Sequence, residues 1–191
     1  MKHRRSTLRL RPLPDYLRPG LKVIFVGYNP GLRSAQLGRY YAGRGNQFWP
    51  FLGRVGLVPA GWTFRDDARL VDVGLGLTDL VKQPSRSANQ LRAEHFRSGR
   101  PVLRRKLLRY RPAAVAFVGK GVFERFTGQQ THLGPQAEKL AGARVFVLPS
   151  TSGANASLSP AQKLRYFRQL ARWLAFDCQS SSENRRAVQN V

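Results

Sequence analysis

Residues 22–31 read KVIFVGYNPG, and this stretch decides the class of fold. The segment 23–27 is an unbroken apolar run without a polar residue at every second position. Such a run is typical of a strand that is buried on both faces of a parallel sheet. Asn29-Pro30-Gly31 then marks a turn. The stretch therefore predicts a buried strand that ends in a loop and carries the amide of Asn29 at its carboxyl end.

Two more segments share this character, AVAFVG at residues 114–119 and VFVLP at residues 145–149. Segments with helical periodicity lie between and after the three runs. Buried strands that alternate with helices favour an α/β fold with helices on both faces of the sheet. We therefore predict a three-layer α/β/α sandwich around a central, mainly parallel sheet.

The expected helices follow from caps and apolar spacing. One helix should begin at Asn46, and a short one near Phe64. The segment 87–110 has helical periodicity with a break near residue 99, so Pro101 should open a new helix. The last helix should begin at Ser159-Pro160, with an apolar face that runs to Leu174.

Ligands of such sheets bind in the loops beyond the carboxyl ends of the strands. Two loops of unusual composition follow strands, GYNPGLRSA at residues 27–35 and PSTSGANAS at residues 149–157. We expect them to flank one cleft, although more than a hundred residues separate them.

The net charge is the strongest feature of the composition. The 191 residues include 33 Lys and Arg against 10 Asp and Glu, a formal charge of +23. Such an excess favours a polyanionic partner, usually nucleic acid. An arginine-rich surface that merely reflects genome composition is the alternative, and charge does not separate an enzyme from a passive binder. Candidate phosphate contacts in the first loop are Arg33, Arg39 and Arg44.

The length and the 42% hydrophobic content are those of one domain. We predict a basic arm at residues 1–20, a single domain at 21–176 and a polar, disordered tail at 177–191. One cysteine and three histidines form neither a disulfide nor a metal pattern. No apolar segment is long enough to span a membrane. The basic N-terminus is not followed by the apolar stretch of a secretory signal, so we expect a cytoplasmic protein.

Five ordered segments carry a resemblance to a known family: GYNPGLRSA at 27–35, RYYAGRGNQFW at 39–49, GLGLTDLV at 74–81, FVGKGVFERF at 117–126 and VLPSTSGANASLSPAQK at 147–163. Together they resemble the mismatch-specific uracil and thymine DNA glycosylases, the second family of the uracil-DNA glycosylase superfamily. The resemblance covers residues 22–174 in unbroken order. It implies the fold of that superfamily, with no metal and no cofactor.

The resemblance also implies a reaction, a substrate and the residues of the site. The expected enzyme is a monomeric, bacterial-type, monofunctional glycosylase of base-excision repair, in which water attacks the sugar C1′. Its partner would be double-stranded DNA with uracil or a G-mismatched base, or single-stranded DNA. Asn29 matches the catalytic asparagine that positions the water, and Tyr41 matches the aromatic residue that stacks on the flipped base. Backbone groups of Tyr28 and Tyr41 would read the base edge, and Ser34 would lie close to the base.

The loop after residue 148 departs from the family pattern. The resemblance implies that this segment enters the DNA, yet it carries no large side chain to act as a wedge. Asn155 could bond to the widowed base, or the stretch could be a plain turn capped by serines. The expected loop residues are Ser150, Thr151, Ser152, Gly153, Ala154 and Asn155.

Asp79 is the second departure, because the family position often carries asparagine or lysine. It could be a second catalytic residue beside Asn29, ionised at neutral pH by the many arginines. It could instead cap a helix or form a surface ion pair with an arginine.

Two other functions stay open on the sequence alone. One is a non-catalytic nucleic-acid-binding domain on the same fold. The other is a nucleotide or phosphate binder that uses the GYNPG loop at residues 27–31.

Overall fold

One mixed sheet organises the part of the chain that the computed structural model describes, residues 10–188 with side chains through residue 175. Within it five strands stand in the order β2-β1-β3-β5-β4. The strands are β1 (Val23–Gly27), β2 (Leu75–Asp79), β3 (Ala114–Val118), β4 (Gly134–Leu140) and β5 (Ala143–Leu148). All neighbours pair in parallel except β4, which is antiparallel to β5. The predicted mainly parallel sheet is confirmed.

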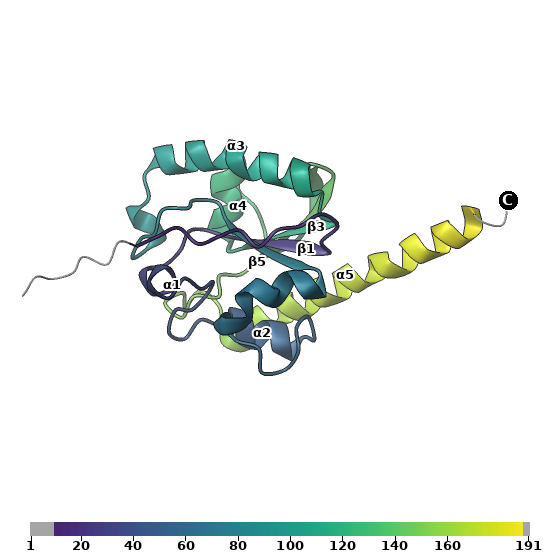
Figure 1. Ribbon diagram of the computed structural model, residues 1–191, viewed down its shortest axis with the longest axis horizontal. Coiled ribbons are helices and arrows are strands. Elements are labelled where there is room, and N and C mark those ends of the chain that lie inside the picture. Colours follow the sequence, from purple (N-terminus) through teal and green to yellow (C-terminus); the bar gives the residue numbers. More distant parts are fainter. Residues whose placement is uncertain (1–9, 189–191) are drawn as a thin grey trace, which may run out of the picture.

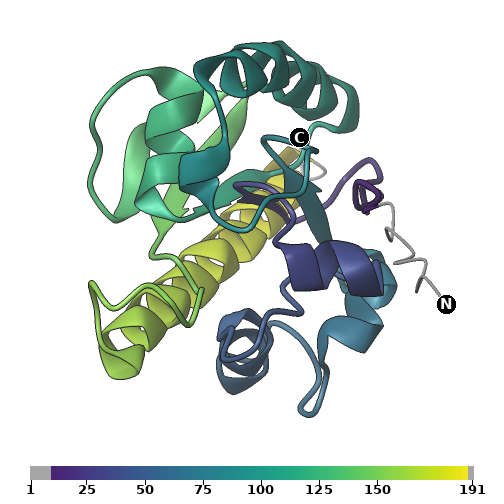
Figure 2. The same ribbon diagram turned by 90° about the vertical axis from the view of Figure 1, so that its left-hand side faces the viewer.

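Helices cover both faces of this sheet. Figure 1 shows α3 (Ala93–Tyr110) and α4 (Lys120–Thr127) on one side, and α2 (Phe48–Arg54) and α5 (Pro160–Val188) on the other. Smaller elements are α1 (Leu32–Leu37), η1 (Phe64–Val73) and η2 (Ala88–Gln90). The turned view in Figure 2 shows α5 passing along the sheet on the side away from α3. The three-layer sandwich is therefore confirmed.

The core has two parts, one on each face of the sheet, because successive side chains of a strand point to opposite faces. Phe25 and its neighbours on one face pack against α2 and α5, and Phe25 meets Phe48 edge-on at 5.2 Å. Val26 and Phe117 face α3 and α4 on the other side. Every residue of β1 is buried, and each buried Phe or Val side chain contributes about 1.5–3 kcal/mol. This burial holds the strand ends, where the loops begin, in fixed positions.

Two elements differ from expectation because their sequences conflict with local rules. β4 carries glycine, proline and charged residues, which suit an edge strand and hide its strand character. The helix α3 runs unbroken through Pro101 instead of starting there. Proline removes the amide that would bond to the carbonyl of Arg97, and that position is exposed to solvent.

The chain ends also differ from expectation. The half of the basic arm at residues 10–20 is packed rather than loose: Leu13 is buried, and Tyr16 pairs with Leu77 through two 3.0 Å backbone hydrogen bonds. Residues 1–9 lie outside the described range. At the other end α5 stays helical to Val188, where the sequence predicts a disordered tail (Figure 1). A helix that packing has nucleated gains one bond per added residue, so polarity alone does not end it. Among the described residues, no helix has the length and apolar character needed to cross a membrane.

Candidate functional site

The carboxyl ends of β1 and β2 put Asn29 and Asp79 at the same edge of the sheet. Gly27 is the register partner of Asp79. The alternation along the strands puts both on the face that carries α2 and α5, because Phe25 and Leu77 pack there. The side chain of Tyr28 lies on the opposite face, edge-on to Phe96 of α3. Only the backbone of Tyr28 can therefore contact a ligand on the face that carries Gly27 and Asp79.

The amide of Asn29 is held in one orientation. Its Nδ2 donates to the carbonyl of Gln83 at 2.9 Å, to Oγ of Ser85 at 2.8 Å and to the carbonyl of Pro30 at 3.3 Å. Ser85 in turn donates to the carbonyl of Ser87 at 2.7 Å. Since the nitrogen makes these contacts, the oxygen Oδ1 is the atom that can accept a hydrogen bond from a water. Sequence reasoning missed Gln83 and Ser85, which lie 54 and 56 residues away along the chain.

Tyr41 lies under the end of β1 with a left-handed backbone, at φ 54°. Its ring stacks on Phe48 at 3.9 Å between centroids. A Cβ at Gly27 would lie 3.1 Å from the hydroxyl oxygen of Tyr41 and 2.6 Å from Oδ1 of Asp79. Glycine is therefore required at position 27, and the hydroxyl and the carboxylate both point to the space beside it.

The loop that carries Tyr41 is fastened from both sides. Ser34 Oγ accepts a hydrogen bond from the amide of Ala42 at 3.1 Å, and Arg33 Nε donates to the carbonyl of Ala42 at 2.9 Å. Arg39 forms a 2.6 Å ion pair with the fully buried Asp67. Two of the three arginines predicted as phosphate contacts, Arg33 and Arg39, therefore hold the loop, whereas Arg44 is exposed.

Asp79 is buried, with 5% of its surface exposed. Burial raises the pKa of Asp79 to about 6, and Lys82, the Tyr40 hydroxyl and Lys106 limit that rise. The nearest cation is Lys82, whose Nζ lies 4.0 Å from Oδ2. Within the described residues, neither Oδ2 of Asp79 nor the hydroxyl of Tyr41 has a hydrogen-bond partner.

These observations correct three expectations about Asp79. It ends a strand, so it caps no helix. It is buried, so it forms no surface ion pair with an arginine. Lysines rather than arginines favour its ionised form. The carboxylate still prevails at neutral pH, because a pKa of about 6 lies below 7.

The loop at residues 150–155, which follows β5, meets the loop at residues 43–47. The amide of Gln47 donates to the carbonyl of Thr151 at 2.9 Å. A Cβ at Gly153 would lie 3.1 Å from the carbonyl oxygen of Gly45. Thr151 is buried, whereas residues 152–155 are exposed. The cleft expected between the loops at residues 27–35 and 149–157 stays a prediction, because these contacts join the second loop to residues 44–47.

The tip of this loop is anchored from α5. Lys163 is 4% exposed, and its Nζ donates to the carbonyl of Asn155 at 2.5 Å. Oδ1 of Asn155 accepts from the hydroxyl of Ser157 at 2.7 Å. These two hydrogen bonds fix the turn that carries the exposed Ala154. The Nδ2 group of the neighbouring Asn155 can still donate hydrogen bonds.

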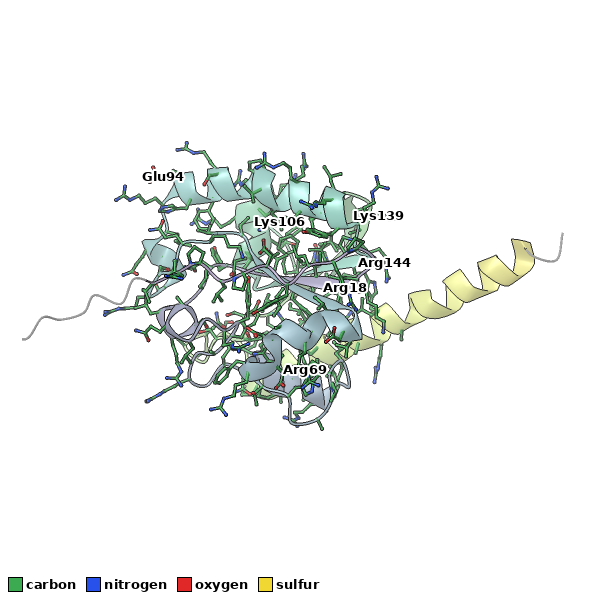
Figure 3. All side chains as sticks on the ribbon, viewed as in Figure 1. Arg18, Arg69, Glu94, Lys106, Lys139 and Arg144 are labelled. Atoms are coloured by element: carbon green, nitrogen blue, oxygen red, sulfur yellow. The ribbon has the colours of Figure 1, made fainter. Side chains whose placement is uncertain are left out.

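The positive charge is not confined to the site. Figure 3 labels basic side chains above the sheet on α3 (Lys106), below it on η1 (Arg69) and at one end of the body (Lys139). Positive charge on several sides of a protein favours a polyanionic partner. Among the described residues, no cluster of three or more His, Cys, Asp or Glu could hold a metal ion.

Comparisons with known proteins agree with this geometry. Residues 14–175 match the family model "Uracil DNA glycosylase superfamily". A G/U mismatch-specific uracil DNA glycosylase of Schizosaccharomyces pombe is 37% identical over 165 residues, which cover 81% of this chain and 51% of that protein. The chain thus spans about half the length of this relative.

A solved structure supports the fold alone. The solution structure of a Methanosarcina acetivorans protein assigned as a uracil DNA glycosylase superposes with a TM-score of 0.53 at 18% identity. The match covers 87% of this chain and 98% of the other. With the family match across nearly all of the folded body, the resemblance seen in the sequence is confirmed: the chain belongs to the uracil DNA glycosylase superfamily.

Proposed function

We propose that this protein is a monofunctional DNA glycosylase that flips uracil out of DNA and hydrolyses its bond to the sugar. The observation that carries the proposal is the fixed amide of Asn29 at the end of β1, with Oδ1 available to a water. Membership of the superfamily and the charge of +23 support it. The resulting abasic site would enter base-excision repair.

The proposed reaction breaks the bond between the sugar C1′ and the base nitrogen. The electron pair of that bond leaves with the base, and the oxygen of water bonds to C1′. Oδ1 of Asn29 accepts a hydrogen bond from this water and aims it, but an amide is too weak a base to take its proton.

Asp79 is the proposed second catalytic residue. Its carboxylate would take the proton of the attacking water and oppose the positive charge that develops on the sugar. A pKa of about 6 suits this task, because the group is ionised at neutral pH and still basic. The carboxylate lies beside Gly27, and its Oδ2 has no hydrogen-bond partner among the described residues, which supports the assignment.

The base would lie against Tyr41 and the backbone of Tyr28. Stacking on an aromatic ring is worth about 1–3 kcal/mol per base. Backbone N–H groups can stabilise the negative charge on the departing base. Ser34, whose hydroxyl accepts a hydrogen bond from the amide of Ala42, would lie close to the base.

The loop at residues 150–155 would enter the DNA beside the flipped base. Its exposed position next to the loop at 43–47 supports this role. With only Ala154 at the tip, the amide of Asn155 would bond to the widowed base in place of a wedge.

The proposed substrates are uracil in double-stranded DNA, including G/U mismatches, and uracil in single-stranded DNA. Mismatched thymine or modified cytosine are further candidates. The S. pombe relative is named for G/U mismatches. We further propose that the protein acts as a monomer on nucleoid DNA in a bacterial cytoplasm.

Incubation with a labelled oligonucleotide, followed by alkali, tests the function. The substrates are U·G, U·A, single-stranded U and T·G, and a matched C·G duplex is the control. We expect strand breakage at uracil only after alkali, because a glycosylase without lyase activity leaves an intact abasic strand. Tight DNA binding without any abasic site would assign the protein to the non-catalytic DNA-binding class instead.

A further inference from the structure

A partly exposed charge cluster adjoins Asp79 through Lys82, and its centre is Asp15, a residue of the segment before β1. The carboxylate of Asp15 lies 2.5 Å from Nζ of Lys82 and 2.7 Å from Nζ of Lys106. Thr78 Oγ1 donates to the same carboxylate at 2.6 Å. The backbone pairing of Tyr16 with Leu77 holds this segment against the edge of β2.

Lys82 stands between two carboxylates, and the distances are unequal. Its Nζ is 2.5 Å from Asp15 but 4.0 Å from Asp79. Its other hydrogen bonds go to the carbonyl of Leu13 at 3.1 Å and to the hydroxyl of Tyr40 at 3.0 Å. Three donors on one ammonium group are thus directed away from Asp79.

We propose that Asp15 is a positioning residue for the site: by holding the ammonium of Lys82, it keeps Oδ2 of Asp79 free to accept a proton. This inference rests on the proposed catalytic role of Asp79. Without the charge of Asp15, the flexible lysine stem could close the 4.0 Å gap and form a direct hydrogen bond with Oδ2. The attraction grows as the distance shrinks, so such a pair would make the carboxylate a weaker base.

The groups that face Asp79 from each neighbouring element agree with this arrangement. Tyr40 and Tyr41 come from the loop after α1, Lys82 follows β2, Lys106 lies on α3, and Asp15 precedes β1. Burial raises the pKa of both tyrosines, so they stay neutral. Asp15 is therefore the one negative charge among these five groups that offsets the two lysines.

Asp15 itself is ionised when Asp79 titrates. Burial acts to raise its pKa, but Lys82, Lys106 and Thr78 outweigh burial and lower it. Its charge is therefore constant across the range in which Asp79 changes protonation.

The test replaces Asp15 by Asn in the full-length protein and follows two readouts. Carbon-13 NMR of the Asp79 carboxyl gives its titration midpoint directly, and single-turnover cleavage of a uracil oligonucleotide gives the pH profile of the chemical step. We expect the midpoint to fall by about one pH unit and the rate at pH 8 to fall about threefold, in line with the weaker base. In the double variant Asp15→Asn/Lys82→Gln, the titration midpoint of Asp79 should return most of the way to the parent value, because the ammonium of Lys82 is gone.

Asp72→Asn is the matched control, since Asp72 is exposed and pairs only loosely with Arg18 at 3.8 Å. It should leave both readouts unchanged. Lys82→Arg, which keeps Asp15, should also lower the midpoint, because a guanidinium fork reaches both carboxylates. If Asp15→Asn does not fold, the titration midpoint of Asp79 in Lys82→Arg tests the inference instead.

The two readouts separate the inference from the proposed function. A shifted midpoint with reversal in the double variant supports the role of Asp15, and an unchanged midpoint in the folded variants overturns it. If the midpoint shifts while the rate profile stays the same, Asp15 controls the charge of Asp79 as inferred, and the proposed catalytic role of Asp79 fails.

Discussion

Asn29 and Asp79 occupy neighbouring strand ends, but the chain constrains them differently. Asn29 follows β1 and is tied by its nitrogen to the loop at residues 83–85. Asp79 is the last residue of β2, and it is buried beside Gly27. One side chain is therefore fixed for orientation, whereas the environment of the other tunes its charge.

Asn29→Ala should reduce single-turnover cleavage of uracil by at least about 100-fold, because the water loses its positioning group. DNA affinity should change little, since phosphate contacts supply most of it. Rapid-quench cleavage and fluorescence anisotropy measure the two quantities. Asn89→Ala, an exposed asparagine on η2, is the control. Near-parent cleavage by the Asn29 variant would rule out its catalytic role.

Asp79→Asn keeps the shape of the side chain and removes its charge. We expect about a 10-fold loss of the single-turnover rate at pH 8, with little change in DNA affinity. The parent rate should fall as the pH drops through about 6, where the carboxyl gains its proton, and the variant should lack this dependence. Saturating enzyme keeps product release out of the measurement. Equal rates from pH 5 to 9 would make Asp79 structural.

The same substitution should affect folding. The folded pKa of Asp79, about 6, lies above the usual 3.8, so the folded state binds more protons than the unfolded state between these values. Stability is therefore lost as the pH rises from 3.8 to 6, and the full cost of about 3 kcal/mol persists above 6. Urea unfolding at pH 8 should show Asp79→Asn to be more stable than the parent. A less stable variant would mean that the ionised carboxylate of Asp79 does not destabilise the folded state.

At the scale of elements, the loop at residues 150–155 is the part of the site with the least bulk. Ala154→Arg should supply a wedge, so we expect tighter binding of abasic product and slower release, measured by competition with labelled product DNA. Ala161→Arg adds the same charge to an exposed position in the first turn of α5, and it controls for charge alone. If both variants bind the abasic product equally, the loop at residues 150–155 does not enter the DNA duplex.

At the scale of the whole molecule, the charge of +23 predicts steep salt dependence of DNA binding. The logarithm of the binding constant should fall with the logarithm of salt by about 0.9 per phosphate contact. Arg44→Ala should lower this slope by about one contact, because Arg44 is exposed beside Gly153 of the loop at residues 150–155. Arg172→Ala, far along α5, should leave the slope unchanged. A flat salt response of the parent would contradict a polyanionic partner.

The layered α/β fold, the strand-end loops and the family could all be predicted from the sequence. These follow from patterns over a few residues: continuous apolar runs such as 23–27 report burial on both faces, and NPG reports a turn. The resemblance to the family, rather than strand geometry, predicted that Asn29 and Tyr41 share one site.

How the site residues are held depends on contacts between distant parts of the chain. The partners of Asn29 lie 54 and 56 residues away, and Asp15 meets Thr78 across 63 residues. No local pattern predicts such contacts, because they depend on how β1 and β2 pair in register and on the segment that packs beside them. The burial that raises the pKa of Asp79, and the two lysines that limit the rise, likewise come from packing rather than from the neighbours of Asp79 in the chain.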